Sequence, residues 1–402
     1  MKETYTYLIT KLLNLKEGEV TLTEISEEDG KITVSLKLKE KELTCPKCGS
    51  TKLYKHGRVK IRRVRHSWMM GKVIDLKILD RPRWKCTKCN KTFLEEISFL
   101  KGRSRYTKQA EQEAIVLLKG RSFSEVSKEL KISYSTLRRI LLSFKFEEEI
   151  KDFLMKSKEL YIGIDEHSFR HQDMVLIVTE LKSKRLLAIL ENDRLSTLER
   201  FLKLIPKERV KEFCIDMKIG YKKVIKRLFP EAKVVLDRFH LISDANRRVD
   251  EARRIEQELR KVSIPKKILL VGNERLSERS KAKLNSLIRS YPIVGFFYFV
   301  KEELRRLYLS KDRKEAEDKL NRLILIMVDN DDPEICRWGR TLREWKEEIL
   351  NFFFNRTTNG YTEGCNTKAK LLKRISFGMR NVTVYINKIL LAFLPPNAFH
   401  TI

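Results

Sequence analysis

The sequence predicts a multidomain α/β protein in which two small N-terminal modules precede a mixed β-sheet. The chain has 402 residues, too many for one ordinary compact domain. Hydrophobic residues make up 42% of it, which is enough for packed cores and too much for a disordered chain. Two C-x-x-C pairs stand in the first quarter, and strand and helix patterns alternate from residue 161 to 236.

Positive charge is concentrated in one short part of the chain. The formal net charge is +30. Residues 1–44 carry seven Lys against nine acidic residues, whereas residues 45–108 carry nineteen Lys and Arg against four Asp and Glu, a net of +15. Such charge could serve solubility alone, but its concentration is typical of a phosphate-binding surface. We therefore expect a nucleic-acid partner.

Neither a membrane span nor a secretion signal is expected. No apolar run reaches membrane-spanning length, and the stretch MKETYTYLITKLLNLKEGEV lacks a signal-peptide core and cleavage site. These patterns predict a cytoplasmic protein.

The first two segments are predicted to be a small N-terminal piece and a zinc-binding module. Residues 1–44 indicate a short helix and a hairpin that turns at EEDGK. In residues 45–104, the motifs CPKC and CTKC supply Cys45, Cys48, Cys86 and Cys89. Two such pairs let four thiolates converge on one Zn²⁺, and four thiolates leave no open position for catalysis. We therefore expect one structural Zn²⁺.

The spacing between the two cysteine pairs is longer than usual for zinc. The alternating stretch VIDLKIL and the turn candidate MMGK predict a hairpin that brings the pairs together. Two disulfides, or four unrelated thiols, are the alternatives, and an intracellular chain disfavours the disulfides. The hairpin also carries three arginines that could contact a DNA backbone: Arg62, Arg63 and Arg65.

Residues 105–150 predict a helix-turn-helix domain. Ser122 and Glu125 form a capping-box pattern for its middle helix. Apolar residues mark the inner face of the third helix, which leaves four residues facing outward, toward a major groove: Ser135, Thr136, Arg138 and Arg139. A generic helical bundle is the alternative. The short turn directly after a basic zinc module favours the helix-turn-helix.

Three carboxylates stand where metal ligands would be expected. The apolar strand 161–164 ends in Asp165, and the strand 212–215 ends in Asp216. Glu363 opens a helix beyond the Asn-Gly pair at 359–360. Three converging carboxylates would repel one another without a counterion. Mg²⁺ takes oxygen ligands and bridges phosphate, and two such ions support in-line phosphoryl transfer.

The order of the predicted elements is that of a ribonuclease-H-like fold. Strands are expected at 161–164, 174–181, 185–190, 212–215 and 232–236, and helices at 196–205, 217–228 and from about 363. The helix 196–205 carries a capping pattern of Ser196 and Glu199. Residues 239–352 are helical and charged, with no convincing strand.

Seven stretches together resemble one known family. They are CPKCGS, HGR, CTKC, GIDEHSFR, IDMKIGY, LFPEAKVVLDRFHL and NGYTEGCNTKAKLLKRISFGMRN. The chain resembles the DDE transposases of prokaryotic insertion sequences, specifically the ISL-three family, from residue 45 to about 390. The resemblance implies that Asp165, Asp216 and Glu363 are a catalytic triad. It also implies a catalytic domain of residues 158–240 and 353–395, interrupted by a helical insertion at 241–352.

The resemblance further implies a function. The protein would bind the terminal inverted repeats of its own element and cut and rejoin DNA, target DNA included. Each active site would use two Mg²⁺ or Mn²⁺ ions, and pairing two ends implies a homodimer or larger synaptic complex. A ribonuclease-H-like nuclease such as a junction resolvase is one alternative, but it needs neither N-terminal module. A non-catalytic, transposase-derived DNA-binding protein is another, and the presence of all three acids disfavours it.

Several residues near the triad have competing interpretations. Asp237 also ends an apolar strand and is the rival second acid, although Asp237 and His240 are expected instead to support the site or to contact DNA. Lys370 and Arg374 share a helix face with Glu363 and could contact phosphates. Trp338 and Trp345 could stack on bases, but core packing is the favoured interpretation. Glu166 and His167 alternate away from the metal on a strand and are not first choices.

Overall fold

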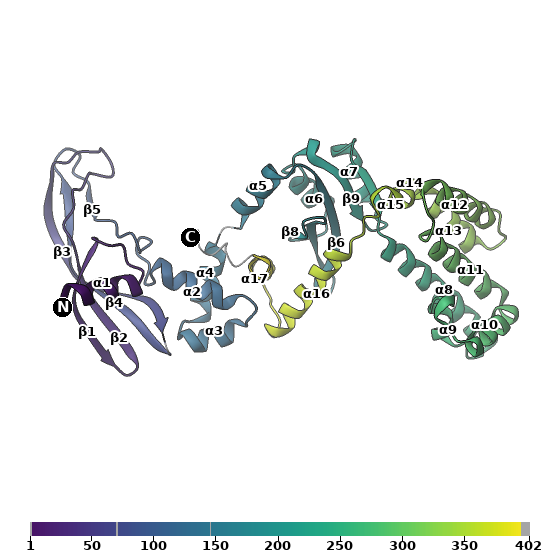
Figure 1. Cartoon of the computed structure of the whole chain (residues 1–402), viewed down its shortest axis with the longest axis horizontal. Coiled ribbons are helices and arrows are strands. Elements are labelled where there is room, and N and C mark those ends of the chain that lie inside the picture. The colour runs from purple at the N-terminus through teal and green to yellow at the C-terminus, as the bar shows by residue number, and fades with distance from the viewer. Residues whose placement is uncertain (1, 70, 145, 395–402) are drawn as a thin grey trace. The chain divides into compact units, whose positions relative to one another are not determined.

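The structure is a computed structural model, and it describes residues 2–69, 71–144 and 146–394. Its internal contacts divide the chain into two compact units. Unit 1 comprises Met1–Lys145 with Leu371–Ile402, and unit 2 comprises Phe146–Lys370. Each unit contains one β-sheet, and Figure 1 labels most of the strands. Within the described residues, no helix has both the length and the apolar character that crossing a bilayer requires.

Unit 1 opens with helix α1 (Lys2–Leu12) and a five-stranded sheet. Its strands are β1 (Val20–Glu28), β2 (Lys31–Leu38), β3 (Leu53–Met69), β4 (Lys72–Cys86) and β5 (Thr92–Leu94). The hairpin predicted at EEDGK is present, and its turn residues Asp29 and Gly30 have φ of 47° and 69°. Because β2 runs parallel to β4, residues 1–44 extend the sheet of the cysteine-bearing hairpin β3–β4.

Three short helices follow, as predicted: α2 (Lys108–Leu118), α3 (Phe123–Leu130) and α4 (Tyr134–Ser143). The predicted capping box is present at α3. Glu125 N donates to Ser122 Oγ across 3.1 Å, and Ser122 N donates to Glu125 Oε2 across 2.9 Å. The inner-face residues Val126, Leu130 and Leu137 are buried. Local capping and apolar spacing therefore define this domain.

A fourth helix, α17 (Val382–Phe393), packs on α4 and completes the bundle. The fully buried amine of Lys388 donates to the main-chain carbonyls of Leu118, the last residue of α2, and of Arg121, in the turn before α3. In return, Lys119 Nζ donates across 2.6 Å to the carbonyl of Leu394, which caps α17. The carbonyls at a helix end lack partners within the helix, so each helix supplies a cation to the end of the other.

Unit 2 contains the predicted mixed sheet. Its strands are β6 (Leu160–Arg170), β7 (Asp173–Glu180), β8 (Arg185–Leu190), β9 (Val210–Ile215) and β10 (Lys233–Leu236). The order is β10-β9-β6-β7-β8. Strand β9 is parallel to β6 and β10 is parallel to β9, whereas β7 is antiparallel to β6 and β8 is antiparallel to β7. Residues 160–165 of β6 are all buried, as expected for a central strand covered on both faces.

Two local predictions in unit 2 were wrong. The strand predicted to stop at Ile164 runs on to Arg170, because β7 pairs with it well beyond the point where β9 ends. Ser196 does not cap the next helix either. Helix α6 (Leu195–Leu202) begins one residue earlier, and Glu199 instead pairs with Lys203 and Arg227.

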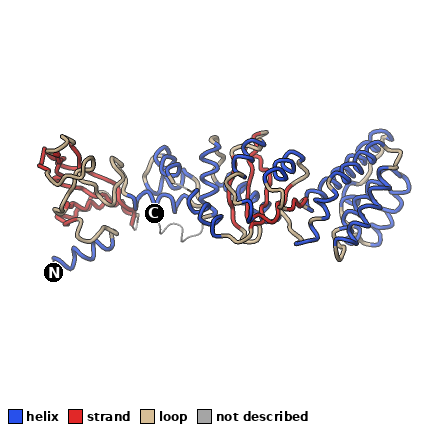
Figure 2. Tube along the Cα trace, turned by 90° about the horizontal axis from the view of Figure 1, so that it is seen from above, coloured by secondary structure: helices blue, strands red, loops and turns tan. Residues whose placement is uncertain are grey.

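The rest of unit 2 is helical, apart from two short 3-10 turns. The helices are α5 (Glu147–Lys156), α7 (Ile219–Leu228), α8 (Arg238–Arg260), α9 (Lys266–Leu270), α10 (Glu278–Ser290), α11 (Pro292–Leu307), α12 (Arg313–Val328), α13 (Pro333–Glu344), α14 (Lys346–Leu350), α15 (Phe352–Asn355) and α16 (Gly360–Ile375), whose last turn belongs to unit 1. From α8 to α16 the chain forms no strand, as the blue segments of Figure 2 show. Trp338 and Trp345 are 0% and 1% exposed, so both are core residues. The finer domain boundaries stay a prediction.

Candidate functional site

The parallel pairing of β6 and β9 brings two of the predicted acids to the same edge of the sheet. Gly163 is paired with Cys214, so Asp165 and Asp216 each follow the paired positions by two residues. Asp165 is 7% exposed, and its position lies within β6 rather than at its end. Because β9 stops at Ile215, nothing from that strand covers the two carboxylates.

Helix α16 brings the third acid to this edge because residue 163 is a glycine. A Cβ atom on Gly163 would lie 2.4 Å from Asn359 Oδ1 and 2.4 Å from Thr362 Oγ1. The first turn of α16 therefore sits directly on β6. Thr362 is also held by Thr179 of β7, with their hydroxyl oxygens 2.7 Å apart. This packing fixes the turn that carries Glu363.

His240 lies among the three carboxylates. Its Nδ1 is 3.1 Å from Asp216 Oδ2, and its Nε2 is 3.9 Å from Asp165 Oδ1 and 4.0 Å from Glu363 Oε1. The potential ligand atoms of Asp165, Asp216 and His240 all lie within 4.8 Å of one another, as do those of Asp237, His240 and Glu363. The described residues thus contain two overlapping ligand groups that share one histidine.

Asp237 is buried behind this cluster at 1% exposure. Its main-chain N–H donates to Ile215 O across 2.9 Å, and its Oδ1 accepts from the N–H of Asn359 at 3.1 Å. Asn359 in turn donates from Nδ2 to Ile164 O across 2.9 Å. Asp237 therefore links β9, β6 and the turn before α16.

Burial and mutual repulsion raise the pKa values of the clustered acids. Burial, followed by the charges of Asp165 and Asp237, raises the pKa of Asp216 to about 8. Burial is also the main cause of the raised pKa values of Asp165 and Glu363. Within this cluster, three buried carboxylate oxygens have no hydrogen-bond partner among the described residues: Asp216 Oδ1, Asp237 Oδ2 and Glu363 Oε1.

These oxygens fit a hard divalent cation. Unpartnered buried carboxylate oxygens are costly, and a cation would both satisfy them and remove the repulsion. Carboxylate oxygen is also the ligand type that Mg²⁺ and Mn²⁺ take. The described donor set therefore suits these metals.

Sequence reasoning missed two amides of this site. Asn366 donates from Nδ2 to Asp165 Oδ2 across 2.6 Å, and Asn359 makes the contacts described above. Asn366 follows Glu363 by three residues and so lies on the same helix face, and this spacing is the sequence pattern that could have identified it as a site residue. Glu166 turns away to accept from Tyr221 Oη at 2.6 Å and from Lys218 Nζ.

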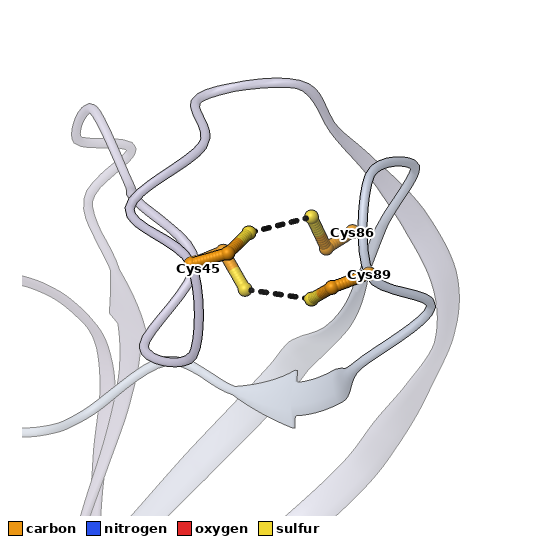
Figure 3. A group of neighbouring side chains, drawn as sticks. Cys45, Cys86 and Cys89 are labelled. Carbon is orange, nitrogen blue, oxygen red and sulfur yellow. Dashed lines mark hydrogen bonds between the residues drawn. The ribbon is translucent and has the colours of Figure 1, made fainter.

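The four predicted cysteines meet between two turns of unit 1. Cys45 Sγ lies 3.5 Å from Cys89 Sγ, and Cys48 Sγ lies 3.6 Å from Cys86 Sγ. Figure 3 shows the sulfurs of Cys45, Cys86 and Cys89 turned toward one another. A zinc tetrahedron with Zn–S near 2.3 Å separates its sulfurs by about 3.8 Å, close to these distances. The cysteines are free thiols, so the disulfide alternative was wrong.

The three arginines predicted to contact DNA from the hairpin differ in their surroundings. Arg62 Nη2 donates to the carbonyls of Gly102 and Ser104, each at 2.9 Å. Arg65 Nε donates to Asp75 Oδ1 across 2.6 Å. Only Arg63 is exposed. Two of the three therefore hold the module together, and the role of all three in DNA binding stays a prediction.

The predicted DNA-facing residues of the third helix lie on its outer side. Ser135, Arg138 and Arg139 are exposed and, with Tyr134, border a shallow depression of about 510 Å³. Thr136 is half-buried, and its hydroxyl accepts from Ser133 Oγ at 3.0 Å. On α16, Lys370 and Arg374 are both exposed.

Comparison with known protein families identifies the chain. A family profile described as "Transposase" matches residues 162–389, more than half of the chain. The chain belongs to the transposase family ISL3. The helix-turn-helix domain of this family matches residues 95–144, and the zinc finger of transposases IS204/IS1001/IS1096/IS1165 matches residues 41–89. These matches confirm the predicted family and the three kinds of domain in this transposase.

Individual relatives agree with the family match. The chain is 24% identical over 394 residues to the transposase for insertion sequence element IS1001 of Bordetella parapertussis, covering 94% of this chain and 96% of the relative. It is 24% identical over 253 residues to the transposase for IS1557 of Mycobacterium tuberculosis, covering 55% and 57%. The solved Drosophila P element transposase strand transfer complex matches with a TM-score of 0.42 and 17% identity, covering 74% of this chain and 94% of that one.

Proposed function

We propose that this transposase cuts and rejoins DNA with Asp165, Asp216 and Glu363 as its metal-binding triad. The observation that supports this proposal best is the set of unpartnered buried oxygens in a cluster of acids with raised pKa values. Such a cluster costs free energy in the metal-free protein and is useful only if a cation binds there. Two bound Mg²⁺ or Mn²⁺ ions would stabilise the attacking and leaving oxygens of an in-line phosphoryl transfer.

The residues around the triad hold it in position. Asn366 orients the Asp165 carboxylate, and Asp237 joins the strand edge to the turn before α16. Gly163 allows that turn to approach the sheet. His240 lies within 4.0 Å of a carboxylate oxygen of each of the three acids, so it would stand beside the scissile phosphate. We assign Asp216 as the second acid and Asp237 as a positioning residue.

The remaining parts of the chain would supply DNA recognition. The zinc module and α4 would bind the terminal inverted repeats, with one structural Zn²⁺ on the four cysteines. Lys370 and Arg374 would contact phosphates next to the triad. Pairing of two element ends calls for a homodimer or larger synaptic complex, and the DNA substrate implies a cytoplasmic site of action. The domain boundaries given from the sequence belong to this proposal.

Strand cleavage of the ends that flank the gene tests the proposal. With Mg²⁺, we expect the parent to nick at the ends and to join the released 3′-OH to target DNA. Asp165→Asn should abolish both steps and leave DNA affinity nearly unchanged, because phosphate and base contacts on unit 1 provide most of it. Asp173→Asn, an exposed acid on β7, is the matched control.

Two outcomes would change the assignment. Full cleavage by Asp165→Asn would overturn the proposed chemistry. Asp237→Asn should keep measurable activity, whereas Asp216→Asn should not. The reverse result would make Asp237 the second acid and Asp216 the positioning residue, and the proposed transposase function would stand. Cleavage without any strand transfer would favour a nuclease.

A further inference from the structure

A basic cavity in unit 1 has no part in the chemistry above. It lies between the loop after α1, the end of β2, strands β3 and β4, and the segment 94–103, and its volume is about 1000 Å³. Eight Lys and Arg side chains border it, against three Glu. Like charges gathered around a concave, low-dielectric surface focus a strong positive potential.

Arg81 is the most deeply buried of these cations, at 6% exposure. Its Nη2 donates to the main-chain carbonyl of Glu95, but its buried Nε has no hydrogen-bond partner among the described residues. Burial and the nearby charge of Arg62 lower the pKa of Arg81, and the charge of Glu95 only partly offsets them. A buried donor without an acceptor, next to a second cation, favours a bound anion.

The exposed cations around the cavity are available for such an anion. Lys16, Lys39, Arg103 and Lys108 are exposed and form no ion pair or side-chain hydrogen bond with other described residues. They come from four separate segments of the chain. A single small anion would need them to converge on one point, whereas a run of backbone phosphates can meet them in turn.

We propose that this cavity binds the phosphate backbone of DNA without regard to sequence, as a contact separate from α4. The inference rests on the proposed function. The volume reaches the upper limit of ordinary small-molecule pockets, about 300–1000 Å³, and a lone phosphate would leave most of it empty. The cavity also lies mainly in the segment 45–108, which holds half of the excess positive charge of the chain. A free polyphosphate shares the same chemistry, and the test distinguishes it.

The test compares two double variants of the full-length protein. Lys39→Gln with Arg103→Gln removes two exposed cations of the cavity. The control is Lys37→Gln with Arg105→Gln. Lys37 and Arg105 are exposed cations that lie two residues from Lys39 and Arg103, respectively, and neither of them borders the cavity. Binding of a random-sequence duplex is measured by fluorescence anisotropy over a series of salt concentrations.

The cavity variant should bind the duplex about tenfold more weakly at low salt. Its plot of log affinity against log salt should be shallower by about 1.8, since each lost phosphate contact removes about 0.9. The control variant should stay within about twofold of the parent. The ratio of affinities for end DNA and random DNA should not change, because phosphate contacts carry no sequence information. Equal losses in both variants, or no loss in either, would overturn the inference.

Calorimetry with tripolyphosphate decides between the two sources of phosphate. Any binding of tripolyphosphate to the parent should disappear when saturating duplex is present, because the two would share the cavity. Binding that persists beside the duplex would assign the cavity to a small anion and overturn the inference. If the protein binds and cleaves its ends but the two double variants behave alike, the cavity inference is wrong and the proposed function still stands. If the protein neither binds nor cleaves its ends, the proposed function itself is wrong.

Discussion

Asn366 donates a hydrogen bond from Nδ2 to Asp165 Oδ2 across 2.6 Å, although 201 positions separate the two residues. The same amide lies 3.3 Å from the carbonyl of Glu166. The other oxygen of Asp165 accepts from the N–H of Glu166 at 2.7 Å. The direction of the Asp165 carboxylate is therefore set by one donor from its own strand and one from α16.

Asn366→Ala should weaken metal binding without removing a ligand. Loss of a residue that orients a metal ligand typically costs about 10- to 100-fold in affinity or activity. We expect cleavage to fall by that factor and to recover partly at high Mn²⁺, with DNA affinity unchanged. Asn387→Ala is the control, since Asn387 is a half-buried amide on α17 that donates to Thr383 O of its own helix across 2.8 Å. A loss that no metal concentration relieves would contradict the positioning role.

Gly163→Ala should displace the first turn of α16. The new Cβ would overlap Asn359 and Thr362, so the helix that carries Glu363 must move. Overpacking of this kind costs about 1–3 kcal/mol of stability, and we expect at least a tenfold loss of cleavage. Gly364→Ala on the same helix meets nothing within 4 Å and should keep activity. Thermal melts and cleavage rates of both variants check this prediction, which fails if the two behave alike.

The metal-free protein should lose stability as pH rises. Asp216 has an ordinary pKa of 3.8 and a folded-state pKa of about 8. Between these values the folded state holds a proton that the unfolded state has released, so the free energy of unfolding falls with increasing pH. In EDTA, Asp216→Asn should raise Tm over the parent at pH 8.5 and much less at pH 5. Asp173→Asn should show no such difference, and a pH-independent effect of Asp216→Asn would contradict the repulsion.

Zinc removal should unfold the cysteine end of the β3–β4 hairpin. Burial alone would raise the pKa of Cys45, but the N–H groups of Lys47 and Cys48 lower it to about 6, which favours the thiolate that zinc requires. Metal analysis should find about one zinc per chain. Cys86→Ser should lose the zinc and weaken DNA binding, since metal binding and folding are coupled. Cys336→Ser should retain both, and unchanged zinc in Cys86→Ser would exclude the four-cysteine site.

Arg138 should contribute more to sequence preference than Arg139. Arg139 Nη1 lies 3.8 Å from Glu111 Oε1, whereas Arg138 is exposed and has no partner among the described residues. One good arginine–base contact discriminates by about 1–3 kcal/mol. Arg138→Ala should therefore reduce the ratio of affinities for end and random DNA more than Arg139→Ala does. Competition binding measures both ratios, and two unchanged ratios would exclude α4 as the reading helix.

Local patterns predicted most of the elements and the three acids. The capping box of Ser122, the cysteine pairs and the apolar strands before Asp165 and Asp216 are contained within a few residues each. Such signals need no knowledge of distant contacts, because sterics and hydrogen bonding within one element produce them. The family resemblance then connected Asp165 and Asp216 with Glu363.

The features that escaped prediction all depend on distant partners. The length of β6 is set by β7, and Asn366 looks like any polar helix residue until Asp165 is placed beside it. Gly163 gives no sign in the sequence that a helix nearly 200 positions later will touch it. Arg62 and Arg65 resembled free surface cations, but their partners are main-chain carbonyls and Asp75.

Lys388 of α17 and Lys119 at the end of α2 each bind the end of the other helix. The helix-turn-helix domain therefore cannot be completed until the C-terminal helix α17 has been synthesised. A growing chain on the ribosome contains α2, α3 and α4 long before Lys388 and the apolar face of α17 exist. Until then, the carbonyls of Leu118 and Arg121 lack their cation and one side of α4 stays uncovered. If α4 reads the element ends as proposed, prematurely terminated chains would carry it in an incomplete bundle and would compete poorly for those ends. A chain able to occupy an end is then one in which Asp165, Asp216 and Glu363 have already been made.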